Sequence, residues 1–149
     1  MTPLIDPGAV THGIQLAIAP VFLLTAVSGM IGAVAGRLSR IIDRARLLEE
    51  HIQASADTAF VAHARGELAT LRTRGLLTNA AIGLLTLCSF LIGLTIIVLF
   101  VGETTVFQID RFAIVSFLTS IVCFMLALVC FMVETLIATR LLNFGKARD

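Results

Sequence analysis

Charged residues are absent from three long stretches of the chain, and each stretch is almost continuously apolar. These stretches cover residues 13–36, 75–102 and 112–133. A helix needs roughly 20 apolar residues to cross the hydrocarbon core of a bilayer, because each residue adds only about 1.5 Å of rise. The pattern therefore predicts three transmembrane helices.

Between the first two stretches, apolar residues recur at spacings of three and four on an otherwise charged segment. This spacing is typical of one narrow, heptad-like face of a helix. A turn at residues 53–57 divides the segment, so we expect two antiparallel arms that form a helical hairpin. The same seam either contacts other copies of the chain or a protein partner, or merely closes the hairpin on itself. Its residues are Leu38, Ile41, Ala45, Leu48, Ile52, Leu68 and Leu71.

The predicted fold is therefore all-α, a single integral membrane domain over residues 1–149 in which the first two transmembrane helices extend into a cytoplasmic antiparallel hairpin. Its expected parts are the outer N-terminal segment 1–12, span one 13–36, the hairpin 37–75, span two 76–101, the outer loop 102–111, span three 112–139 and the cytoplasmic tail 140–149.

Composition supports a membrane protein and gives its orientation. Hydrophobic residues make up 58% of the chain and charged residues only 14%, too apolar for an ordinary soluble domain. The basic residues gather in the hairpin and the tail, and only Arg111 lies on the opposite side. Because basic loops stay on the cytoplasmic side, we expect the N-terminus outside and the C-terminus in the cytoplasm. The net charge of +1 argues against a nucleic-acid partner.

Each span carries small or polar residues at helical spacing, and we expect these faces to point inward because helices in lipid associate through small residues and polar contacts. In spans one and two the packing residues are Ser28, Gly32, Gly36, Asn79, Gly83 and Thr86. In span three the face holds Ser116, Ser120, Cys123 and Cys130. This last face fits either a tightly packed bundle or a narrow polar pathway through an oligomer.

Glu134 is the one acidic residue within a predicted span, near the inner end of span three. An ionised carboxylate at that depth needs a partner or water. The candidate partners are Arg37, Arg40, Arg72 and Arg74. The carboxylate is either a structural ion pair that ties span three to the hairpin base or a titrating group that gates or binds a cation.

Other chemistry is sparse. Folding the hairpin at its turn brings His51 near His63, with acidic residues around them, which makes the pair a weak candidate for a divalent metal; the ordinary interpretation is two solvated histidines. We assign no metal and no cofactor. No nucleophile, base and orienting group occur together at membrane depth, so we do not expect an enzyme.

Four segments carry a family resemblance: IQLAIAPVFLL, RLSRIIDRARLLEE, LRTRGLLTNAAIGLLTLC and FMVETLIATRLL. Together they resemble a bacterial family of small membrane proteins, the domain of unknown function number 2721. The resemblance covers nearly the whole chain. It implies an inner-membrane location and brings no established activity and no functional residues.

Two functions fit these expectations. The first is a homo-oligomer that forms an ion or small-solute pathway through its polar faces. The alternative is a membrane scaffold or accessory protein whose cytoplasmic hairpin docks a protein partner. In both, the partners are the lipid bilayer and other copies of the chain.

Overall fold

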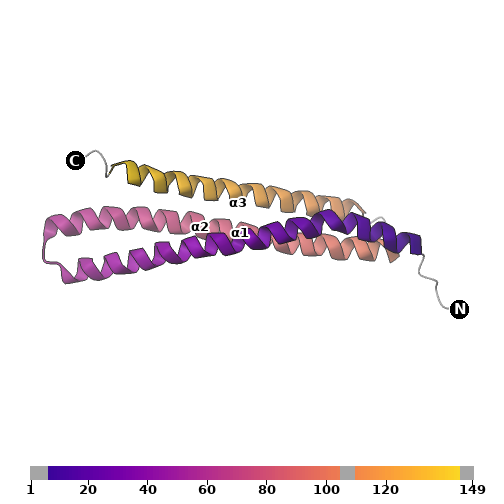
Figure 1. The fold of residues 1–149 in the computed structure, drawn as a ribbon, viewed down its shortest axis with the longest axis horizontal. Coiled ribbons are helices and arrows are strands. Elements are labelled where there is room, and N and C mark those ends of the chain that lie inside the picture. The colour runs from indigo at the N-terminus through magenta and orange to yellow at the C-terminus, as the bar shows by residue number, and fades with distance from the viewer. Residues whose placement is uncertain (1–6, 105–109, 145–149) are drawn as a thin grey trace. The chain divides into compact units, whose positions relative to one another are not determined.

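Three long helices make up the part of the chain that the computed structural model describes, residues 7–104 and 110–144 (Figure 1). They are α1 (Pro7–Ala54), α2 (Thr58–Thr104) and α3 (Asp110–Phe144). No strand occurs within these ranges. The all-helical class predicted from the sequence is confirmed.

Each helix is long and apolar enough to cross a membrane. With 48 and 47 residues, α1 and α2 are each about 70 Å long at 1.5 Å per residue. The hydrocarbon core of a bilayer is only ~30 Å thick. Both helices therefore have room for a complete span and for a further arm outside the hydrocarbon.

The chain divides into two compact units. The first comprises Met1–Met30 and Leu84–Met125, and the second comprises Ile31–Gly83 and Leu126–Asp149. Each unit contains part of all three helices.

A short turn separates α1 from α2 within the second unit. The Ser55 backbone N–H donates to the His51 carbonyl at 3.1 Å and closes the end of α1. Asp57 caps the start of α2, because its Oδ1 accepts a hydrogen bond from the Ala59 N–H at 2.9 Å. Aspartate and serine compete well for backbone groups at such ends, which explains why the helix breaks here.

The heptad-like residues of the second unit are buried or half-buried. Ile41 of α1 and Ala64 and Leu71 of α2 are buried. Gly75 of α2 faces Ile41 of α1, since a Cβ placed on it would lie 3.8 Å from the Ile41 Cγ2, an ordinary van der Waals contact. Ile41 and Leu71 of the apolar seam are thus buried within the chain, and a contact of the seam with another chain stays a prediction.

Ion pairs between α1 and α2 flank this seam on the surface. Arg44 donates to the Glu67 Oε1 from Nε at 3.0 Å and from Nη2 at 2.6 Å. Arg72 donates to the Glu49 Oε1 at 3.3 Å. Exposed pairs of this kind contribute about 0–1 kcal/mol each, so they favour a register without creating the fold.

The first unit has an apolar core from all three helices. Its fully buried side chains include Val27 of α1 and Leu85, Cys88 and Ile92 of α2. In this unit a polar contact joins α3 to α2: the Ser116 hydroxyl donates to the Leu91 carbonyl at 3.1 Å.

Candidate functional site

Glu134 is the one charged side chain that is fully buried in the described part of the chain, with an exposed fraction of 0%. It lies on α3 in the second unit. Taking a carboxylate out of water costs several kcal/mol even after relaxation, so a buried one has to be paired and hydrogen-bonded.

Two arginines from two other helices meet this carboxylate. Arg74 of α2 donates to Oε1 through Nε at 3.0 Å and through Nη2 at 2.9 Å. Arg37 of α1 brings its Nη2 within 2.8 Å of Oε2. Arg74 therefore forms well-aligned hydrogen bonds with Oε1. The contact of Arg37 with Oε2 is an ion pair without hydrogen-bond alignment, and among the described residues Oε2 accepts no hydrogen bond.

The aromatic ring of Phe131 positions the Arg37 guanidinium. The Cζ of Arg37 lies 5.0 Å from the ring centroid, within the range of a cation–π contact. Phe131 and Glu134 are three residues apart on α3, so they are neighbours on one helix face. Sequence reasoning missed Phe131, although this spacing from the carboxylate was the signal that could have found it.

Arg37, Arg74 and Glu134 form a cluster with a net positive charge. Two guanidinium groups carry two positive charges against one carboxylate. The arginine side chains keep 28% and 18% of their surface exposed while the carboxylate has none. The cluster therefore ties three helices together around a buried anion and presents an excess positive charge outward.

The other two arginines predicted as partners lie elsewhere. Arg72 is exposed and pairs with Glu49. Arg40 is exposed and makes no polar contact with the described residues. The four candidates thus separate into two that bind the carboxylate and two that do not.

The small and polar face of α3 lies against the chain itself. In the first unit, Ser120 and Cys123 are buried, and the Ser120 hydroxyl donates to the Phe117 carbonyl at 2.6 Å. Ser116 is bonded to α2 as described above. In the second unit, Cys130 is half-buried. These hydroxyl groups bond to backbone carbonyls within the chain.

The small residues of α1 are arranged differently from the expectation. Ser28, Gly32 and Gly36 are all exposed, and a Cβ added to either glycine would meet nothing within 4 Å. Branched residues take the buried positions of α1 instead, at Val27, Val34 and Ile41, every seventh residue. This face is therefore not buried within one copy of the chain, and its role in helix packing stays a prediction. The exposed face still has the composition of a helix-packing surface.

On α2 the predicted packing residues are exposed as well. They are Asn79, Gly83 and Thr86. The buried positions of this helix fall instead on Thr78, Ala81, Leu85 and Cys88. A role for the exposed residues in contacts with another chain stays a prediction.

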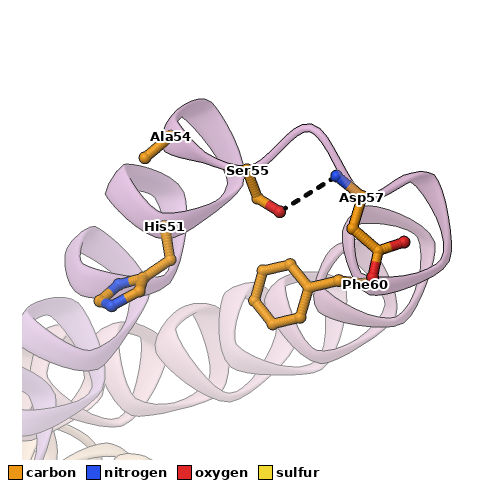
Figure 2. A pocket seen from close by; sticks show the side chains of 5 residues that line it. All are labelled: His51, Ala54, Ser55, Asp57 and Phe60. Carbon is orange, nitrogen blue, oxygen red and sulfur yellow. Dashed lines mark hydrogen bonds between the residues drawn. The ribbon is translucent and has the colours of Figure 1, made fainter.

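A shallow hollow of about 430 Å³ lies at the hairpin turn (Figure 2). Its lining residues are His51, Ala54, Ser55, Asp57 and Phe60. A ring nitrogen of His51, Nδ1, lies 2.7 Å from the Leu47 carbonyl, to which it donates. His63 does not line this hollow, and the described ranges contain no group of three or more metal-ligating residues. A metal site at the two histidines gains no support.

Comparison with known proteins gives one match. A family model described as "Protein of unknown function (DUF2721)" matches residues 17–144. No curated protein and no solved structure matches the chain significantly.

Proposed function

Because the chain belongs to the family described as protein of unknown function (DUF2721), whose description carries no activity, we propose a function from its geometry. The protein is a self-associating membrane scaffold that presents a helical hairpin to a protein partner in the cytoplasm. It has no enzymatic role.

This proposal rests on one observation: the polar groups of α3 within the membrane are bonded to other groups of the same chain. Glu134 is fully buried between Arg37 and Arg74, and the Ser116 and Ser120 hydroxyls bond to backbone carbonyls. A pathway along α3 would need these groups to face water. Their contacts instead fit structural ties that hold the helices together.

The membrane orientation follows from the distribution of basic residues. The hairpin arms, residues 37–75, carry most of the arginines, while Arg111 precedes span three on the other side. Because basic segments resist translocation, the hairpin is cytoplasmic, the N-terminus is outside, and the arms run antiparallel from the inner membrane into the cytoplasm.

Self-association is assigned to the exposed small face of α1, defined by Thr25, Ser28, Gly29, Gly32 and Gly36. Nothing of the chain's own lies within 4 Å of a Cβ added at any of the three glycines. Lipid gives no advantage to glycine over leucine on an exposed face, whereas close approach of a second helix requires small residues. A second copy of α1 is the simplest occupant.

A partner protein is assigned to the turn end of the hairpin. Phe60, at 41% exposure, lines the hollow together with His51 (Figure 2). An exposed aromatic side chain beside a polar rim is typical of the residues that anchor protein interfaces. The hollow is shallow, so a partner side chain would lie over it.

Photo-crosslinking in intact cells tests the scaffold. Phe60 is replaced by photoreactive benzoylphenylalanine, and exposed Ala69 on the same helix is the matched control. The scaffold predicts a covalent adduct at position 60 whose mass differs from that of a chain dimer, and little adduct at position 69. Equal adducts at both positions, or none, would argue against a partner at the turn.

A pathway is the second candidate, and the exposure of Asn79 on span two favours it. An amide facing lipid is unfavourable, so copies of the chain could direct it toward a shared aqueous path. Ion flux into proteoliposomes decides this point: a pathway requires wild-type flux that changes in Asn79→Leu while assembly persists. If the wild-type protein shows no flux across K⁺, Na⁺, H⁺ and Cl⁻ gradients, the pathway is excluded and the scaffold is the remaining candidate function.

A further inference from the structure

The Arg37–Arg74–Glu134 cluster lies where each helix passes from apolar to charged sequence. Arg37 follows the charge-free stretch 13–36, Arg74 precedes the stretch 75–102, and Glu134 follows the stretch 112–133. Lipid hydrocarbon ends near such transitions and the phosphate-bearing headgroups begin. All three side chains are therefore at headgroup level, on the side of the membrane where the arginines gather.

Guanidinium donors in this cluster exceed the acceptors that the chain supplies. An arginine carries five N–H donors and no acceptor. Arg74 uses Nε and Nη2 on Glu134, whereas Arg37 has only the unaligned ion pair with Oε2. Its other N–H groups bond to no acceptor among the described residues, yet the guanidinium is half-buried and held over the Phe131 ring.

Arg40 adds a second source of unpaired donors. It lies three residues after Arg37 on α1, and residues three apart are neighbours on a helix surface. Its side chain is exposed and has no polar partner among the described residues. The surface outside the buried carboxylate therefore offers two adjacent guanidinium groups, and with Arg40 included two positive charges are left that Glu134 does not neutralise.

We infer that Arg37, Arg40 and the outer edge of Arg74 bind the phosphate of an anionic phospholipid. Guanidinium groups bind phosphate oxygens in pairs, with two parallel N–H donors on two oxygens. Glu134 and Phe131 serve as positioning residues, since they hold Arg37 in place before the lipid arrives. This lipid site is separate from the partner surface at the hairpin turn and does not depend on it.

Native mass spectrometry of the full chain tests the inference, with the detergent-purified protein incubated with either phosphatidylglycerol or phosphatidylcholine. We expect wild type to retain phosphatidylglycerol at least five-fold better than phosphatidylcholine. Arg37→Gln is expected to lose most of this preference. Arg46→Gln is the matched control, because Arg46 is exposed on the same helix about 13 Å further along it, and it is expected to keep the wild-type preference.

Two further measurements keep the result unambiguous. If Arg37→Gln loses helix content by circular dichroism, Arg40→Gln replaces it, since Arg40 has no described contact to lose; it is expected to lower the preference at least two-fold. Inorganic phosphate at 10 mM is expected to displace little lipid. The lipid site would be overturned if wild type retained the two lipids equally, or if inorganic phosphate displaced the lipid fully. It would also be overturned if the Arg37 or Arg40 variant kept the wild-type preference, or if Arg46→Gln lost as much of the preference as they do.

Discussion

At the scale of single residues, Glu134 is the fully buried charged side chain of the part of the chain that the structure describes. Its carboxylate is removed from water and depends on Arg74 for hydrogen bonds and on Arg37 for a second charge contact. Removing one partner of a buried ion pair leaves the other uncompensated, which costs far more than the loss of an exposed pair.

Glu134→Gln should therefore lower the free energy of unfolding by about 2–4 kcal/mol, because both arginines lose their counter-charge. Glu67→Gln is the matched control, since Glu67 also accepts two bonds from one arginine, but in an exposed pair; it should cost less than about 1 kcal/mol. Unfolding in mixed micelles, followed by circular dichroism, measures both. Similar losses for the two variants would show that burial of Glu134 contributes nothing.

The sequence was sufficient to identify Glu134 and to name four arginines as partners, but not to choose among them. Arg72 and Arg74 are two residues apart and so lie on different faces of α2, and one sequence does not give the rotation of that helix against α3. Phe131 was missed because its three-residue spacing from Glu134 becomes informative only once an arginine is placed over its ring.

At the scale of elements, the heptad-like period of α1 and α2 determines which residues meet. In the second unit the period buries Ile41 and Leu71 and leaves Leu47 exposed. The period predicted this seam from sequence because spacings of three and four report directly on helix geometry. In span one, branched residues at every seventh position are buried within the chain and the small face is exposed, so the packing role of that face stays a prediction.

Leu71→Ala should destabilise the chain by about 2–4 kcal/mol, because it leaves a cavity in the seam between the hairpin arms. Leu47→Ala, the same change at a site with 56% exposure, should stay within about 0.5 kcal/mol. Chemical denaturation of the two variants in the same detergent makes the comparison. A loss at Leu47 as large as that at Leu71 would place the seam elsewhere.

The hairpin turn should lie on the cytoplasmic side. A cysteine in place of exposed Gln53 should react with a membrane-impermeant maleimide in inverted vesicles and remain unlabelled in intact spheroplasts. The unsubstituted chain, with Cys88 and Cys123 buried and Cys130 half-buried, is the background control. Labelling in spheroplasts would reverse the orientation deduced from the arginines.

At the scale of the whole molecule, most of each span is not buried within the chain. Only 22%, 22% and 17% of the most apolar windows of the three candidate spans are buried, so lipid or further copies must cover the remainder. Large apolar side chains such as Phe22, Phe90 and Phe112 are suited to lipid. Glycines at the same depth are suited to another helix.

Gly32→Leu should separate the copies without unfolding the chain, because the added side chain meets open space within it and blocks close approach of a second helix. Ala26→Leu is the matched control, an equally small exposed residue on the same helix but outside the small face. Crosslinking in membranes should give oligomers for wild type and Ala26→Leu, and at least a five-fold reduction for Gly32→Leu. Equal crosslinking of all three would remove the small face of α1 from the interface.

The most direct test of a self-associating scaffold is the mass of the wild-type complex in nanodiscs, measured by native mass spectrometry. The geometry predicts a single species that contains two or more copies of the 16.0 kDa chain. A monomer across the accessible concentration range would contradict self-association and leave the exposed glycines of α1 without a role.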